Sequence, residues 1–467
     1  MHTHYAPAPT ALPARPAPAD PDPGVISAQV HADLMAFLAP FLSDLDQHLD
    51  ARLVRTAAST VAACLRFRER HFGLVLSELG AYITSGAHAP AGTKRLSNLL
   101  RSSQWTATEV RDFLWSQAVT TAQELATAGA TVVVVWDQSV AEKPESEHSE
   151  GLGVVCSSKA KRLARHRPTT PDPLRGRPVF VPGCAWANVL IVGAPAQGVP
   201  PAVAAMRWWT NRGEHATSAR VVEQELLDEA VARLGPLGPA VWHVWDRGYA
   251  GAPWLSELLA RQVRFVVRWP KRYQLLDATG QARPTWELAR GKRSWVQQQW
   301  YDPRRRCWRK LGVLAVRVRH PEFPTVELWL VVGRRKGCKE PWYLLTNAPC
   351  ATAALASQVV EVYARRWQVE ASFRYGKSEL AMESPRLHRW ERRLKLLALV
   401  TLAYAFLLSL LKEVARPLRE WLLDHGCHRT GRRQRETTAP LYRLRWALCR
   451  LWSECPPVAI PRWQDSG

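Results

Sequence analysis

The chain has 467 residues, a length that favours two to four domains with sizeable cores. It holds 63 lysine and arginine residues against 41 aspartate and glutamate residues, which gives a formal net charge of +22. This excess favours an acidic partner, and nucleic acid comes first among the candidates. The hydrophobic fraction of 47% excludes a wholly disordered chain. Tryptophan, with 22 copies, could serve either base stacking or core packing.

Nine cysteines lie scattered along the chain without a Cys-x-x-Cys pair, which argues against a secreted disulfide framework and a cysteine-rich zinc site. Residues 1–24 form a Pro/Ala tract without the apolar region of a secretory signal, so we expect a disordered tail. The uncharged stretch from Leu396 to Leu411 is shorter than the roughly 18–20 residues that span a bilayer, so it is expected to be a buried core helix. These features predict a cytoplasmic, nucleoid-associated protein without a membrane partner.

The segment 25–129 is expected to be a helical N-terminal DNA-binding domain. Apolar residues recur there at helical spacing, as at Leu34, Phe37, Leu38 and Phe41. Basic residues on the surface of such a domain would suit contact with DNA. A plain helical bundle without this role is the alternative.

After residue 130 the pattern changes to strands that alternate with helices. The β-branched run Thr131–Val135 predicts a strand buried on both faces, and it leads into Asp137. A second buried strand, 240–245, ends at Asp246 and is followed by a helix over 253–261. Strand-then-helix units imply an α/β core, which we expect over 130–263 and again, with helices, over 349–415.

Between these two parts, residues 264–348 are expected to form a β-rich insertion domain. Four runs there have a strand-like period of two, namely Arg264–Trp269, Leu314–Arg319, Val326–Val332 and Trp342–Thr346. Residues 416–467 form a basic C-terminal region.

Two clusters of other ionisable residues have simple interpretations. The acidic residues of one are interpreted as a solvated charge run: Glu142, Glu145, Glu147 and Glu150. The other cluster, His425, Cys427 and His428, lacks the paired spacing of zinc sites, so a zinc protein stays an alternative with little support.

Four polar residues of the helix expected over 359–380 share one face. They are Tyr363, Arg366, Glu370 and Lys377, which at 100° per residue span about 60°. An acid between two cations and a phenol suits a carboxylate that ligates a metal beside a phosphate. The alternative is a solvated face with ion pairs between residues four apart.

Asp137 and Asp246 could complete a metal site with Glu370. Three carboxylates form a hard, oxygen-rich ligand set that suits Mg²⁺ or Mn²⁺, and a pair of ions would support an in-line phosphoryl displacement. Either aspartate could instead be a turn or capping residue.

The spacing Tyr-x2-Arg-x3-Glu-x6-Lys occurs unbroken in YARRWQVEASFRYGK. With it, the chain resembles the cut-and-paste insertion-sequence transposases of the Asp-Asp-Glu (DDE) type. Trp-Asp-Gln-Ser at Asp137 and Asp-Arg-Gly-Tyr at Asp246 are similar to the first and second Asp motifs of this family. The resemblance covers about residues 131–411.

The resemblance implies an α/β fold: a ribonuclease-H-like mixed sheet flanked by helices, interrupted by a β-rich insertion and preceded by a helical N-terminal domain. It implies a homodimer that joins two transposon ends. Asp137, Asp246 and Glu370 would be both the catalytic residues and the ligands of two Mg²⁺ ions, for which Mn²⁺ would substitute. The DNA-binding residues would be Arg366 and Lys377 on phosphates, Tyr363 assisting them, and Trp342 stacking on a flipped base. The alternative for Trp342 is a plain core tryptophan.

The function that follows is that of a DNA transposase. Metal-dependent phosphodiester hydrolysis would cleave double-stranded DNA at the terminal inverted repeats, and transesterification would join the ends to target DNA. A hairpin intermediate is inferred from the resemblance alone. The alternatives are a metal-dependent nuclease on the same core and a transposase-derived, non-catalytic DNA-binding protein or repressor.

Overall fold

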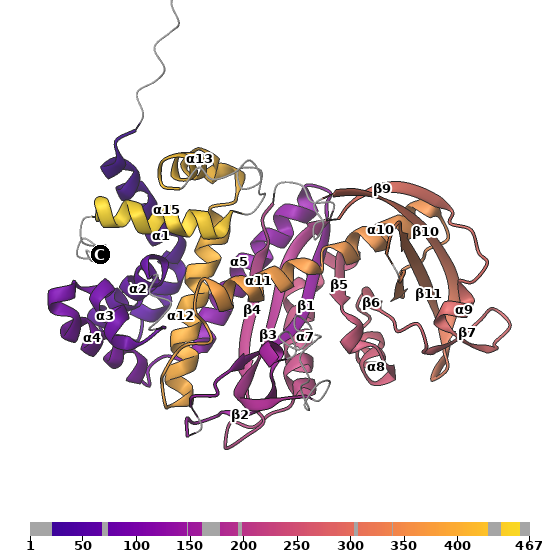
Figure 1. The fold of residues 1–467 in the computed structure, drawn as a ribbon, viewed down its shortest axis with the longest axis horizontal. Coiled ribbons are helices and arrows are strands. Elements are labelled where there is room, and N and C mark those ends of the chain that lie inside the picture. The colour runs from indigo at the N-terminus through magenta and orange to yellow at the C-terminus, as the bar shows by residue number, and fades with distance from the viewer. Residues whose placement is uncertain are drawn as a thin grey trace, which may run out of the picture.

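The computed structural model describes residues 21–67, 73–146, 148–160, 178–194, 199–302, 307–338, 340–427 and 440–457. Helices gather at one end of the molecule, and a long sheet extends from them toward the other end (Figure 1). Most of the expected N-terminal tail lies outside the described residues. The first helix begins within that tail at Pro23, because the Asp22 carboxylate accepts hydrogen bonds from the N–H groups of Gly24 and Val25.

The N-terminal part is mostly helical, which confirms the helical pattern of the sequence. Its helices are α1 (Pro23–Asp46), α2 (Ala51–Arg66), α3 (Leu76–Ile83), α4 (Ala89–Arg101) and α5 (Ala107–Thr127), with a short 3₁₀ turn η1 (Gly86–His88) between α3 and α4. Side-chain caps at Asp22, Asp50 and Thr106 begin α1, α2 and α5. Each cap satisfies backbone N–H groups that have no partner within the helix.

The strands described here form one mixed sheet of twelve, in the order β2-β3-β1-β5-β6-β12-β11-β10-β7-β8, with β4 on β3 and β9 on β10. Their bounds are β1 Thr131–Glu142, β2 Gly153–Cys156, β3 Phe180–Ala194, β4 Ala202–Trp209, β5 Val241–Trp245, β6 Phe265–Arg268, β7 Gln274–Leu276, β8 Ala282–Pro284, β9 Val296–Asp302, β10 Cys307–His320, β11 Phe323–Arg335 and β12 Trp342–Thr346. Strand β1 is parallel to β5 and antiparallel to β3, and β5 is parallel to β6.

Helices cover both faces of the central strands. They are α7 (Ala219–Leu234), α8 (Ala252–Ala260), α10 (Ala353–Ala364), α11 (Trp367–Ser378) and α12 (Trp390–Ser409). Val132 and Val134 of β1 belong to one core with α5, α7 and α8, whereas Val133 and Val135 belong to a second core with α10, α11 and α12. Alternate residues of the β-branched run are therefore buried on opposite faces, as predicted. The expected fold class is confirmed, and it is consistent with a ribonuclease-H-like domain.

The β-rich segment extends this same sheet. Strand β12 pairs with β6, β11 pairs with β12, and β10 pairs with β11, all antiparallel. The pairing of β5 with β6 carries the sheet across the boundary expected between residues 263 and 264. The domain boundaries that we drew from the sequence stay predictions.

Helix α12 contains the uncharged stretch of the sequence and is the expected core helix. Its residues from Leu396 to Leu408 are almost all buried. Of the described helices, α1 is long and apolar enough to cross a membrane, and α12 passes the same test only when joined to the segment after its 78° bend, which includes α13 (Arg416–His425). Helix α1 buries Val30, Leu34 and Leu38 in the core.

The interpretation of Glu142 as part of a solvated charge run is wrong. Glu142 is only 5% exposed. Its carboxylate accepts hydrogen bonds from the hydroxyls of Ser157 and Ser158 and from the N–H groups of Ser158 and Lys159. These donors offset the cost of burying the charge, so Glu142 joins β1 to the segment that follows β2.

A buried histidine links the two parallel strands β1 and β5. The indole N–H of Trp136 donates to Nδ1 of His243 over 3.2 Å. Burial lowers the pKa of His243 from 6.5 to about 3, because the imidazolium ion would lose its hydration. The folded protein therefore keeps this ring neutral where the unfolded chain protonates it.

We predict that His243 makes the protein less stable in mild acid. Its folded pKa is depressed, so its contribution is complete above pH 6.5 and falls by about 1.4 kcal/mol per pH unit as the pH drops toward 3. In His243→Asn the amide oxygen can accept from Trp136 but does not titrate. Between pH 7.5 and pH 5, urea unfolding should show wild type losing about 2 kcal/mol more than the variant. Parallel pH profiles would contradict this prediction.

Candidate active site

The single helix expected over residues 359–380 is wrong. The chain forms α10 and α11, which are separated by a turn at Arg365 and Arg366. The N–H groups of these two arginines bond to the carbonyl groups three residues back, at Val362 and Tyr363, instead of four. A 3₁₀ turn has three residues per turn, so residues three apart point to the same side. Arg366 therefore lies on the same side of the turn as Tyr363.

Arg366 lies between two of the three predicted acids. Its Nη1 atom lies 3.2 Å from Oδ2 of Asp137, and its Nη2 atom pairs with the Glu370 carboxylate. The arginine side chain is 11% exposed. One guanidinium thus joins β1 to α11 and partly neutralises two carboxylates.

Asp137 and Asp246 lie level with each other on neighbouring parallel strands. In the pairing of β1 with β5, Val135 lies opposite Val244, and each aspartate comes two residues later. We expected β1 to end at Asp137. Instead the strand continues to Glu142, because β3 pairs with it along its whole length. Beyond Val135 only β3 flanks β1, so the Asp137 side chain lies just past the β5 pairing.

Asp246 also takes the capping role that we kept as an alternative. It follows β5 directly and its Oδ1 atom accepts a hydrogen bond of 2.6 Å from the N–H of Gly248, in the turn η3 (Arg247–Tyr249). This bond fixes the carboxylate at the end of the strand while leaving its second oxygen available.

The electrostatics of Asp137 show how closely the three acids interact. The pKa of Asp137 is raised to about 7. Burial is the largest cause and the charges of Asp246 and Glu370 add to it, while Arg366 and the N–H of Gln138 oppose the rise. The Arg366 guanidinium does not offset the burial of this carboxylate together with the charges of its two acidic neighbours. The donor set is therefore one that a divalent cation fits by charge and by oxygen chemistry.

The carboxylate oxygens of the three acids are not gathered to ligand distance. Among the described residues, one group of three possible ligands has donor atoms that all lie within 4.8 Å of one another, and this is Glu150, Glu214 and His215. Glu150 already accepts from the N–H of Trp390 and pairs with Arg389. This cluster was missed from the sequence, where Glu150 was interpreted as solvated.

Lys377 has partners within the protein. Its Nζ atom donates to the Val140 carbonyl of β1 and lies 3.1 Å from the Glu383 carboxylate. The second oxygen of Glu383 lies 3.1 Å from Nζ of Lys159. The lysine that we expected on a phosphate therefore lies beside β1, past Asp137, within an ion-pair cluster.

Trp342 and Tyr363 are both buried, at 8% and 4% exposed. Their ring centroids lie 5.2 Å apart, and the Trp300 ring packs against Trp342 on another side at 5.3 Å. The Arg335 guanidinium lies 4.3 Å from the centroid of the Trp342 ring. This environment is that of a core tryptophan with a cation over one face, and the role of Trp342 in base stacking stays a prediction.

Residues of both aspartate motifs are hydrogen-bonded to one acid, Glu223, which we did not identify from the sequence. Glu223 of α7 accepts from the Gln138 side-chain amide and is hydrogen-bonded to Tyr249, whose hydroxyl is buried. Gln138 follows Asp137, and Tyr249 belongs to the Asp246 motif. The only sequence signal here was the helical spacing of α7, which does not say which acid faces the sheet.

Residues 213–406 match the family model described as transposase DDE domain. The matched segment supports a DDE transposase. Such a domain implies DNA binding, with phosphodiester cleavage and transesterification, and generally a divalent metal. The match includes Asp246 and Glu370 but begins after Asp137. Among curated proteins no match to the chain was found.

We predict that Glu223 stabilises the site. Glu223→Ala leaves the buried Tyr249 hydroxyl and the Gln138 amide without their acceptor, which should lower the free energy of unfolding by about 1–3 kcal/mol. Glu225→Ala, on the same helix, removes only a solvent-exposed pair with Arg207 and should cost less than about 1 kcal/mol. Urea unfolding measures both. Equal effects would show that Glu223 is an ordinary surface acid.

Proposed function

We propose that the protein is a DNA transposase of the cut-and-paste insertion-sequence type with the Tyr-Arg-Glu-Lys signature. It would cleave double-stranded DNA at the transposon terminal inverted repeats and join the ends to target DNA, through a hairpin intermediate. The proposal is supported by the contact of Arg366 with Asp137 and Glu370 and by the effect of the Asp246 and Glu370 charges on Asp137, in a chain whose residues 213–406 match a transposase DDE domain.

In this proposal Asp137, Asp246 and Glu370 hold the divalent metal, Mg²⁺ with Mn²⁺ as a substitute, in a site for two ions. When bound, such ions would supply Lewis-acid stabilisation of the attacking and leaving oxygens of the phosphodiester. The raised pKa of Asp137 supports the proposal, because a buried carboxylate with two acidic neighbours is a perturbed group of the kind that gathers at functional sites.

Arg366 would exchange its partners. It now neutralises Asp137 and Glu370, and a cation among the carboxylates would displace the guanidinium by taking over that role. The freed guanidinium would then suit a phosphate of the DNA backbone, with Lys377 on a further phosphate and Tyr363 assisting. The raised pKa of Arg366, a consequence of its buried acidic partners outweighing desolvation, keeps it charged throughout.

The rest of the proposal concerns the wider assembly. A homodimer would hold two transposon ends, and the charge of +22 supports association with nucleoid DNA. For Trp342 to stack on an extruded base, the Arg335 guanidinium would have to leave the ring face that it covers. The alternative to an enzyme is a transposase-derived DNA-binding protein or repressor, which needs none of the three acids.

We expect Asp137→Asn, Asp246→Asn and Glu370→Gln each to lower cleavage and strand transfer by at least about 100-fold. Each change keeps the shape of the side chain and removes one ligand charge. The assay uses the full chain, a labelled duplex from the inverted repeats that flank the gene, supercoiled plasmid and Mg²⁺ or EDTA. Glu391→Gln, an exposed glutamate on α12, is the matched control and should act as wild type.

Two outcomes would decide against this function. Strong binding without any cleavage by the wild type would favour the non-catalytic alternative. Metal-dependent cleavage of any duplex, without joining and without preference for the ends, would favour the nuclease.

A further inference from the structure

Helices α3 and α4 form a tightly joined pair. A Cβ atom on Gly92 would lie 2.1 Å from the carbonyl oxygen of Gly80, and one on Gly80 would lie 2.5 Å from the backbone nitrogen of Thr93. The two helix backbones therefore touch where they cross. The Thr93 hydroxyl lies within 3.3 Å of the Leu76 carbonyl oxygen of α3, which adds a second link. Five residues, 84–88, with Gly86 among them, connect the helices.

Helix α4 has one buried face and one polar face. Leu96, Leu99 and Leu100 are buried in the N-terminal core. On the opposite side Lys94, Asn98 and Arg101 lie four and then three residues apart, so that they span about 60° of the helix. All three are exposed.

This polar face has no partner among the residues that the structure describes. None of Lys94, Arg95 and Arg101 forms an ion pair with a described acid, and the Asn98 amide makes no hydrogen bond to a described group. The sequence of α4 contains no acidic residue. Helices α1 and α5 of the same part carry acids such as Asp44 and Glu124, which would repel a polyanion.

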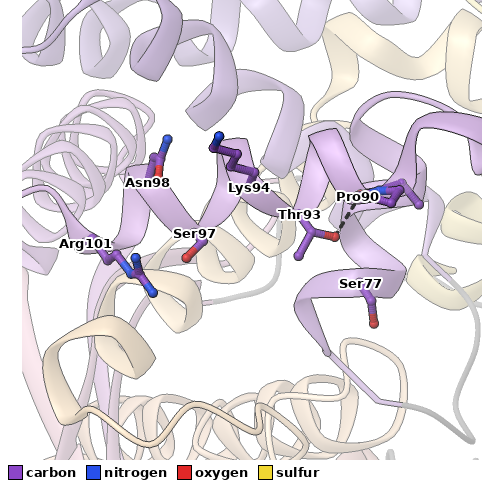
Figure 2. A pocket seen from close by; sticks show the side chains of 8 residues that line it. Ser77, Pro90, Thr93, Lys94, Ser97, Asn98 and Arg101 are labelled. Atoms are coloured by element: carbon purple, nitrogen blue, oxygen red, sulfur yellow. Dashed lines mark hydrogen bonds between the residues drawn. The ribbon is translucent and has the colours of Figure 1, made fainter.

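The polar face borders an open hollow of about 590 Å³. Lys94, Ser97, Asn98 and Arg101 come from α4, and Ser77 lies across from them on α3 (Figure 2). The lining offers ammonium, guanidinium, amide and hydroxyl donors and no carboxylate. Such a surface matches a phosphate backbone at its edge and polar base edges at its centre.

We propose that α3 and α4 form a helix-turn-helix unit whose second helix, α4, reads base edges of the terminal inverted repeat in the major groove. The helix is about 20 Å long and its width suits that groove. Arg101 would bond in bidentate fashion to a guanine and Asn98 to an adenine, and Lys94 would pair with a phosphate. This assignment rests on the proposed function only for the identity of the DNA, since the donor geometry is independent of the acids on the sheet.

The test measures binding of the full chain to two labelled duplexes, an inverted-repeat end and a scrambled sequence of the same composition, by fluorescence anisotropy at several salt concentrations. Asn98→Ala and Arg101→Ala should each reduce the preference for the end about 5- to 100-fold. Arg101→Lys keeps the charge without the fork, so it should lose preference while its binding to scrambled DNA persists. Lys94→Ala should weaken both duplexes alike and reduce the salt slope by about one.

Arg55→Ala on α2 is the matched control, because Arg55 is an exposed arginine of the same helical part. Circular dichroism checks that each variant is folded. The assignment would be overturned if Asn98→Ala and Arg101→Lys kept the same preference for the inverted-repeat end as the wild type. It would also be overturned if the wild type bound both duplexes equally. An equal loss of preference in Arg55→Ala would also overturn it.

The same preparations are assayed for Mg²⁺-dependent cleavage, which separates this inference from the proposed function. If the α4 variants lose their preference for the end but the wild type does not cleave, the transposase function is rejected and the assignment of α4 as the base-contacting helix is kept. If the wild type cleaves but the variants keep their preference for the end, the transposase function is kept and the assignment of α4 is rejected.

Discussion

The contact of Arg366 with Asp137 and Glu370 is the interaction on which the site depends. The two acids come from a strand and a helix that lie more than 200 residues apart in the chain, and repulsion between them would drive the two elements apart. One buried guanidinium offsets part of this repulsion at a low-dielectric edge of the sheet. The helix break at Arg365 and Arg366 places Arg366 at the start of α11, four residues before Glu370.

The sheet provides the rigid frame for this contact. Alternate valines of β1 are buried in two separate cores, so helices hold the strand on both of its faces. The parallel register with β5 then fixes Asp137 level with Asp246. A site with three acids persists because this packing holds it, and the cost appears in the raised pKa of Asp137.

The sequence was informative where the pattern is local. The β-branched run before Asp137 forms a buried strand and the apolar stretch from Leu396 forms a buried helix. Both could be predicted because successive residues in them are apolar. The helix break could not be predicted, since neither glycine nor proline marks residues 365 and 366. Glu142 could not be recognised as buried, because its hydrogen-bond donors lie in a segment at least 15 residues away.

The same limit applies to the candidate site. Spacing alone grouped Tyr363, Arg366 and Glu370, yet it predicted a shared polar face, whereas Tyr363 is buried against Trp342. Glu223 was missed because a helical pattern does not show which of several acids faces the sheet. Contacts with residues that are distant in sequence decide which side chains are buried and which acid faces the sheet.

The most direct test of the proposed metal site is a crystal structure of the protein with inverted-repeat DNA and Mn²⁺, with data collected for manganese anomalous scattering. We predict manganese bound by Asp137, Asp246 and Glu370, with the Arg366 guanidinium moved from these acids to a phosphate. Manganese at Glu150, Glu214 and His215 instead, with Arg366 still paired to Asp137 and Glu370, would contradict it.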